Sequence, residues 1–276
     1  MPISILTLNL WHDSGPWKER ALHIGELIEE LAPDLIGFQE VLHGPDIDLV
    51  AEVLEGRSYH HDFVAASSFQ RAGQPELSFG NSVASRWPIT GRDELRLPDA
   101  GDVETRSALR VTVESPSGPI CVTSTHLNWK LHHGCVRERQ VVALCDFVRA
   151  SRPAEGFPPV LVGDFNAEPD STEIRYVSGL QSLDGRSVYF VDAWRTAGDG
   201  GRGLTWSNRN DYARPWFEPD RRLDYVFVGP PRRDGVGRVL SCRVVGNQAR
   251  DGIWPSDHFG VFARLESEPG PGLDSL

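Results

Sequence analysis

Short runs of apolar residues recur along most of the chain, and their length and composition predict buried β-strands. Residues 3–10 (ISILTLNL) form the first run, and residues 34–41 (DLIGFQEV) form the second. Further strands are predicted at 63–67, 81–86, 108–114, 120–127, 160–162, 189–194, 221–229, 241–246 and 259–266. Turns that contain Gly or Pro separate most of them, as is typical of antiparallel neighbours.

Apolar residues at helical spacing predict three helices between these strands. The first helix ends before Pro33, the second covers 134–150, and the third lies near 171–179. The apolar face of the first helix is predicted to contain Leu22, Leu27, Ile28 and Leu31. Strands interrupted by helices indicate a layered α/β or α+β domain.

The two halves of the chain repeat one plan. ISILTLNLW, a helix and PDLIGFQEV in the first half correspond to ICVTSTHLN, a helix and PPVLVGDFN in the second. The first strand of each unit ends in a polar residue, Asn9 or His126, and the strand after the helix ends in an acid, Glu40 or Asp164. We therefore expect a pseudo-symmetric sandwich that brings these four strand ends to one edge, where ligand sites form in such sheets.

Composition narrows the class of protein. The formal net charge of −11 argues against non-specific coating of nucleic acid, which depends on many Lys and Arg side chains. It does not exclude a nuclease, because metal ions can face the phosphate locally. We expect a cytoplasmic protein, because a predicted strand follows Met1-Pro2 directly and the four cysteines contain no CxxC pair. We expect no stable membrane insertion, because no apolar run approaches the ~20 residues that a membrane helix needs.

The candidate chemistry lies in polar residues that end or interrupt the predicted strands. They are Asn9, Glu40, His126, Asp164, Asn166, Asp224, Asp257 and His258. Several have a structural alternative. Asp164 and Asn166 can cap a helix that begins near Pro169, Asn9 can be a turn residue, Asp224 can pair with Arg222 or cap a turn, and His126 can be a core histidine. A shared site explains all of them together, because buried carboxylates need a cation or hydrogen-bond donors nearby.

The donor atoms favour a hard metal ion. Glu40, Asp257, Asn9 and Asn166 offer oxygen, whereas a zinc site would show Cys or closely spaced His. We therefore predict Mg²⁺, with Mn²⁺ as a substitute. Such an ion, carboxylates and two histidines suit phosphoester hydrolysis, in which the metal polarises the phosphoryl group and a carboxylate or histidine deprotonates water.

Six motifs occur in order along residues 3–266, namely LTLNLW, GFQEV, TSTHL, GDFNAEP, RRLDYVFV and PSDHFGV. Together they resemble the motifs of the endonuclease/exonuclease/phosphatase superfamily. The resemblance implies a four-layered α/β/β/α sandwich and metal-dependent phosphoester hydrolysis. We expect a single domain at residues 1–268 and a disordered tail at 269–276.

The same resemblance implies a role for each strand-end residue. Glu40 would be the principal metal ligand, with Asn9 beside it and Asp257 completing the shell. Asp164 would orient or deprotonate the attacking water, and Asn166 and His126 would contact the phosphate. Asp224 would hold His258 by a hydrogen bond, and the resemblance leaves open whether Asp164 or His258 is the base.

The substrate is less well defined. Repair endonucleases of the exonuclease III type usually carry tyrosine at the position of His126, which disfavours an abasic-site nuclease. The acidic chain favours a small phosphorylated metabolite or phosphodiester. The alternative is a nuclease, because the loop at 207–220 mixes arginines with aromatic residues that can stack on bases. A non-catalytic binding module is the remote alternative.

His132 and His133 are weaker candidates for the cleft, and Arg106 is interpreted as part of a solvated strand face.

Overall fold

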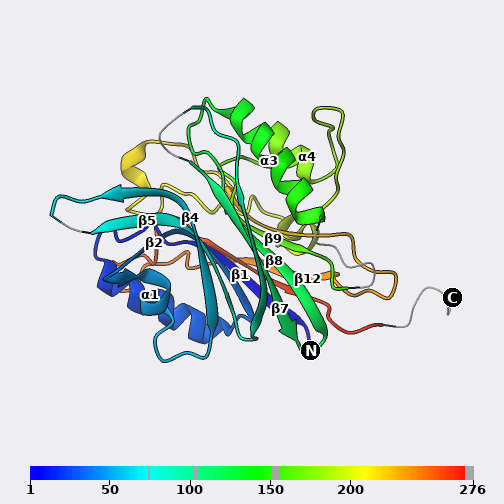
Figure 1. Ribbon diagram of the computed structural model, residues 1–276, viewed down its shortest axis with the longest axis horizontal. Coiled ribbons are helices and arrows are strands. Elements are labelled where there is room, and N and C mark those ends of the chain that lie inside the picture. The colour runs from blue at the N-terminus through cyan, green and yellow to red at the C-terminus, as the bar shows by residue number, and fades with distance from the viewer. Residues whose placement is uncertain (74, 102–104, 151–155, 271–276) are drawn as a thin grey trace.

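Two β-sheets pack face to face with helices on their outer sides (Figure 1). The structure is a computed structural model that describes residues 1–73, 75–101, 105–150 and 156–270. One sheet has the strand order β12-β13-β1-β2-β5-β4, with β3 paired to β2, and the other has the order β10-β11-β9-β8-β7-β6. Helix α1 lies outside the first sheet, and α3 and α4 lie outside the second, which confirms the predicted four-layered sandwich.

The first sheet contains β1 (Ile3–Asn9), β2 (Leu35–Gly44), β3 (Ile47–Asp48), β4 (His60–Gln70), β5 (Glu76–Ser85), β12 (Val239–Val245) and β13 (Gly260–Leu265). The second contains β6 (Ile89–Arg96), β7 (Ser107–Ser115), β8 (Gly118–His126), β9 (Val160–Asp164), β10 (Val191–Asp192) and β11 (Asp224–Val228). The helices are α1 (Trp17–Leu31), α2 (Leu49–Val53), α3 (Gly134–Arg149), α4 (Thr172–Val177), α5 (Ala193–Ala197) and the short 3₁₀-helix η1 (Arg214–Trp216).

The predicted internal symmetry is present in the strand pairing. Helix α1 connects the parallel strands β1 and β2, and α3 connects the parallel strands β8 and β9. Each parallel pair has an antiparallel neighbour on both sides, β13 and β5 in one sheet and β7 and β11 in the other. Because His126 lies opposite Asp164, and Asn9 lies opposite the residue before Glu40, the carboxyl ends of these strands meet at one edge.

The main core lies between the two sheets. It contains aliphatic side chains from both, such as Ile5 and Leu35 from the first sheet and Val122 and Val162 from the second. Gly37 on β2 has no side chain at the point of contact, and a Cβ there would lie 2.3 Å from Val162 Cγ2. The close approach of the two sheets therefore depends on glycine at this position.

The predicted apolar face of the first helix is wrong at one residue, Leu22. Leu27, Ile28 and Leu31 of α1 are buried, but Leu22 is 68% exposed. Leu22 lies nine residues before Leu31, about two and a half helical turns, and therefore faces the opposite side of α1. The buried face instead continues through Ile24.

Several strand predictions also need correction. The segment 189–194 was predicted as a strand, but only Val191–Asp192 is one, because the Asp192 side chain accepts the Arg195 N–H and starts α5. The segment 221–229 shortens to Asp224–Val228. Strand β6 and helix α2 were not predicted. Residues 271–276 of the predicted tail lie outside the described residues.

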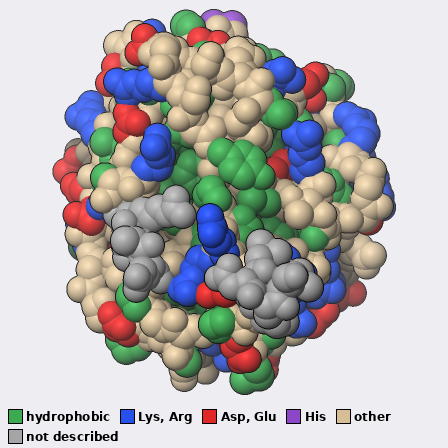
Figure 2. All heavy atoms as spheres, turned by 90° about the vertical axis from the view of Figure 1, so that its right-hand side faces the viewer, with side chains coloured by type: hydrophobic (Ala, Val, Ile, Leu, Met, Phe, Trp, Pro, Cys, Tyr) green, Lys and Arg blue, Asp and Glu red, His purple; other side chains and the backbone are tan. Residues whose placement is uncertain are grey.

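Figure 2 shows the face on the right-hand side of Figure 1. Basic and acidic side chains are interspersed on this face around a central group of apolar ones. Within the described part of the chain, no helix is both long and apolar enough to cross a membrane. All four cysteines are free, with Cys135 exposed and the other three buried.

Candidate active site

The polar strand ends surround a cleft of about 370 Å³. Six of the eight predicted site residues line it, namely Glu40, His126, Asp164, Asn166, Asp257 and His258. Asn9 and Asp224 lie directly behind this wall and hydrogen-bond to lining residues. The structure therefore brings all eight predicted residues together, although they come from segments up to 249 residues apart (258 − 9).

Glu40 is aimed into the cleft by an irregularity in β2. The pairing of β2 with β5 shifts register between Phe38 and Val41, and Glu40 has a φ of 54°. A non-glycine residue in the left-handed region is uncommon, and the surrounding strands must hold it there. Such bulges redirect side chains beside functional sites, and this one turns a carboxylate toward the other acids.

Asn9 is fully buried and links two carboxylates. Its Nδ2 donates to Glu40 Oε1 and to Asp164 Oδ2, both at 3.2 Å. Its Oδ1 accepts the backbone N–H of Trp11 at 2.9 Å. In this arrangement Asn9 acts as a donor that holds Glu40 and Asp164 side by side, and its oxygen is already bonded to the backbone.

Asp164 and Asn166 belong to a tight turn at the end of β9. Gly163 has a φ of 150°, and a Cβ there would lie 2.0 Å from Thr125 O, so the position requires glycine. Asn166 has a φ of 48°, and its N–H donates to Asp164 Oδ1 at 2.8 Å. The alternative of a helix cap is wrong, because α4 begins only at Thr172 with Ser171 at its N-cap position.

His258 lies just before β13 of the first sheet and is held by Asp224, the first residue of β11 in the second sheet. Its Nδ1 lies 2.9 Å from Asp224 Oδ2, and its Nε2 lies 3.7 Å from Asp164 Oδ2. Burial opposes the charged form, but the charges of Asp224 and Asp164 outweigh it and raise the pKa of His258 well above its ordinary value. The alternative that Asp224 pairs with Arg222 is wrong, because Arg222 pairs with Asp192.

The buried carboxylates of the cleft are only partly compensated by positively charged or hydrogen-bonding groups. Burial raises the pKa of both Asp164 and Asp257 to about 7. The charge of His258 lowers both pKa values, whereas the charge of Glu40 raises them. Asp224 Oδ1 is buried without a hydrogen-bond partner. Asp164, Asp224 and His258 place one ligand atom each within 4.8 Å of the others. His258 and Asp224 of this group already bind each other, and Glu40 and Asp257 offer further carboxylate oxygens that line the same cleft, the type of ligand that a divalent cation prefers.

Arg106 corrects the sequence interpretation. It was assigned to a solvated strand face, but it is only 3% exposed, and its Nη1 lies 3.1 Å from His126 Nδ1. The residue precedes β7 and lines the cleft. His126 is buried as well, and its Nε2 lies 2.9 Å from Asn166 Nδ2 and 3.4 Å from Asp164 Oδ2.

Aromatic side chains form much of the remaining wall, and most were not predicted. The lining rings are Trp11, Phe79, Trp129, Trp206 and Trp216. Trp11 stacks on Tyr212 at 4.8 Å between ring centroids, and this contact joins the 207–220 loop to the β1–α1 connection. From that loop only Trp216 and Glu218 line the cleft. His132 and His133 do not line it and contact each other edge to face instead, at 4.5 Å between ring centroids.

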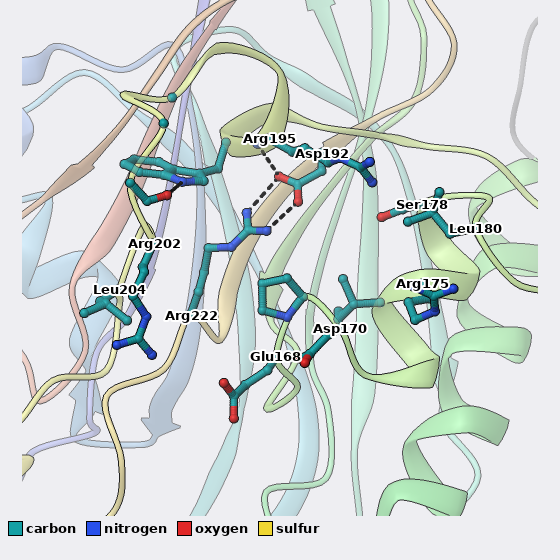
Figure 3. Close-up of a pocket in the computed structure, with 16 residues that line it drawn as sticks. Glu168, Asp170, Arg175, Ser178, Leu180, Asp192, Arg195, Arg202, Leu204 and Arg222 are labelled. Atoms are coloured by element: carbon teal, nitrogen blue, oxygen red, sulfur yellow. Dashed lines mark hydrogen bonds and ion pairs between the residues drawn. The ribbon is translucent and has the colours of Figure 1, made fainter.

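A larger cavity of about 650 Å³ lies beside the β10–α5 segment and contains none of the eight predicted residues (Figure 3). Its charged side chains are mixed in sign and include Arg175, Arg195 and Arg202 as well as Glu168 and Asp170. Figure 3 shows Arg222 bonded to Asp192 at the wall. The two bonds measure 2.9 and 2.7 Å, and both side chains are buried. We therefore place the chemistry in the smaller cleft.

This buried pair predicts a measurable stability effect. Asp192→Ala should lower the free energy of unfolding by about 3–5 kcal/mol, because it leaves the Arg222 charge buried without a partner. Glu26→Ala removes an exposed partner of Arg250 and should cost no more than about 1 kcal/mol. Urea unfolding of both variants measures the difference. Equal effects of the two substitutions would contradict the assignment.

Comparisons with known proteins agree with this geometry. Residues 6–258 match the sequence profile described as the Endonuclease/Exonuclease/phosphatase family. Nocturnin from Drosophila melanogaster is 26% identical over 288 aligned positions, which cover 92% of this chain but only 42% of that longer protein. An endonuclease/exonuclease/phosphatase structure from Beutenbergia cavernae is 26% identical with a TM-score of 0.72, covering 98% of this chain and 72% of that one. TDP2 from D. rerio, complexed with single strand DNA product, is 18% identical with a TM-score of 0.74, covering 96% and 99% of the two chains.

Proposed function

The chain belongs to the endonuclease/exonuclease/phosphatase family, whose members hydrolyse phosphoesters, and from this premise we propose that it is a Mg²⁺-dependent phosphoester hydrolase. The observation that carries the proposal is the convergence of Glu40, Asp164, Asp257 and His258 in one cleft. These groups supply the carboxylates and the imidazole that metal-assisted hydrolysis needs.

Glu40 and Asp257 are the residues proposed to hold the cation, with Mn²⁺ as a substitute. When bound, the cation polarises the phosphoryl group and offsets the negative charge of the carboxylates. Asn9 keeps Glu40 in place through the hydrogen bond from its Nδ2 to Glu40 Oε1. The side-chain oxygen of Asn9 accepts the Trp11 N–H and has a second lone pair that can join the metal.

Asp164 is proposed as the base that orients and deprotonates the attacking water. His258 is proposed to carry a positive charge and to donate a hydrogen bond to the phosphoryl group or the leaving oxygen. The carboxylate of Asp224 supports this assignment, because its bond at Nδ1 leaves the Nε2 hydrogen of His258 free to face the cleft. Asn166 and His126 are proposed to contact the phosphate oxygens.

The ring-lined wall supports a substrate that carries an aromatic group next to its phosphate. A volume of about 370 Å³ suits a small ligand such as a nucleotide or a nucleoside phosphodiester. We therefore propose a small phosphorylated metabolite with a nucleobase. The second candidate is the end of a single nucleic-acid strand, which the solved TDP2 complex with single strand DNA product favours.

Trp216 tests the ring-binding part of the proposal. It lines the mouth of the cleft and is 57% exposed, so Trp216→Ala should raise KM for a nucleotide substrate by about 10-fold through lost stacking. Its neighbour Phe217 is 93% exposed and does not line the cleft, so Phe217→Ala is a matched control that should leave KM unchanged. A similar KM for both variants would remove the support for a base-bearing substrate.

One screen distinguishes the two substrate classes. Purified protein with Mg²⁺ would be offered phosphorylated metabolites, p-nitrophenyl phosphodiesters, and single- and double-stranded DNA and RNA. Asp164→Asn protein serves as the control for contaminating nucleases. We expect hydrolysis of small nucleotide esters. Faster cleavage of oligonucleotides by the wild type alone would favour the nucleic-acid candidate.

A further inference from the structure

The contact between Arg106 and His126 fixes which nitrogen of the histidine carries hydrogen. Arg106 Nη1 lies 3.1 Å from His126 Nδ1, and both side chains are buried. A guanidinium group has hydrogen-bond donors only and stays protonated in proteins. Nδ1 must therefore accept, because a hydrogen on Nδ1 would place two donors face to face between buried side chains.

The hydrogen of a neutral His126 then lies on Nε2, which faces the catalytic groups. Asn166 Nδ2 at 2.9 Å and Asp164 Oδ2 at 3.4 Å are its neighbours there. Nδ2 cannot donate to a nitrogen that already carries hydrogen, so Asn166 must present its oxygen to Nε2–H or turn away from it. Either movement gives up the 3.2 Å bond from Nδ2 to Leu127 O. The amide can make this turn, whereas the guanidinium group has no acceptor to offer.

The two histidines of the cleft consequently differ in charge. Burial is the main cause that lowers the pKa of His126 well below its ordinary value, and the positive charges of Arg106 and His258 add to it. The ring is therefore neutral. His258 faces carboxylates on both of its nitrogens and has the opposite preference. One ring is thus arranged as a neutral donor and the other as a cation.

We propose that Arg106 is a positioning residue that holds His126 as the neutral tautomer with hydrogen on Nε2. His126 then donates a hydrogen bond to the phosphoester and does not accept a proton from it. The tautomer is a property of the folded protein alone, whereas its use on the substrate rests on the proposed phosphoester hydrolysis. The two parts can therefore fail separately.

Nuclear magnetic resonance tests the tautomer without any substrate. Long-range proton–nitrogen correlations of the ¹⁵N-histidine-labelled full-length protein report which ring nitrogen carries hydrogen, and His126→Gln identifies the signal among the nine histidines. We expect hydrogen on Nε2 in the wild type and a mixture of tautomers in Arg106→Met. Hydrogen on Nδ1 in the wild type would overturn the proposal, and this result does not depend on whether the variant folds. An unchanged tautomer in a folded Arg106→Met protein would also overturn it.

A double-mutant cycle tests whether Arg106 acts through His126 or contacts the phosphate itself. Arg106→Met should lower kcat by about 10–100-fold in the wild type, as expected for a residue that orients an active-site histidine. Glutamine at position 126 has an amide donor near Nε2 and no tautomer to set. In the His126→Gln background, Arg106→Met should therefore change kcat by less than about 2-fold. A full additional loss would show that Arg106 binds substrate directly and would overturn the positioning role.

Discussion

Glu40→Gln should lower kcat/KM for phosphoester hydrolysis by about 10³-fold, because it removes the carboxylate best placed to hold the cation. A bound metal ion contributes several kcal/mol to stabilising the transition state, and about 4 kcal/mol corresponds to this factor. Glutamine keeps the length of the side chain and can occupy the same bulge, so the fold should be retained. Steady-state kinetics over a range of Mg²⁺ concentrations and calorimetric titration with Mn²⁺ measure the two effects.

Glu26→Gln is the matched control for this substitution, because Glu26 lies on the exposed side of α1 away from the cleft. It should have wild-type kinetics and wild-type metal affinity. If Glu40→Gln bound Mn²⁺ and turned over substrate as well as Glu26→Gln, the assignment of Glu40 as a metal ligand would be wrong.

Asp164→Asn should lower kcat by about 10²–10⁴-fold, the usual contribution of a general base. Asparagine is almost the same size, and its oxygen can still accept the Asn166 N–H that Asp164 Oδ1 accepts. It cannot take a proton from water at neutral pH. Single-turnover kinetics measure this step separately from product release.

Asp224→Asn gives a graded comparison. Asp224 lies behind His258 and does not line the cleft, so its loss should cost only about 10–100-fold. A larger effect from Asp224→Asn than from Asp164→Asn would indicate that the Asp224–His258 pair is the base. That outcome would reverse the roles proposed for Asp164 and His258.

The sequence was most informative where local pattern and strand geometry act together. Asn9, His126 and Asp164 end their strands, and Glu40 lies in β2 just after the residue that pairs with Asn9. Parallel strands joined by a helix bring such positions to the same edge of a sheet. Their meeting point could therefore be predicted without any side-chain contact. The Asp224–His258 bond was expected only from the family resemblance, because β11 pairs with β9 and His258 precedes β13 in the other sheet.

The sequence could not predict features that depend on contacts across the fold. Arg106 lies beside a strand like any solvated arginine, and only the approach of β7 to β8 places it on His126. The bulge at Glu40 gives no signal in the pattern GFQEV, because its register depends on the partner strand β5. Trp11 likewise acquires its stacking partner Tyr212 only when the 207–220 loop folds over the cleft.

Metal reconstitution is the most direct test of the central claim that the strand-end cleft is a metal-dependent phosphoesterase site. Wild-type protein is first stripped with a chelator and then titrated with Mg²⁺ while hydrolysis of bis-p-nitrophenyl phosphate is followed. We predict no hydrolysis by the stripped protein, recovery with Mg²⁺ in the wild type, and no recovery in Glu40→Gln. Full hydrolysis by the stripped protein, or equal recovery in Glu40→Gln, would contradict the account.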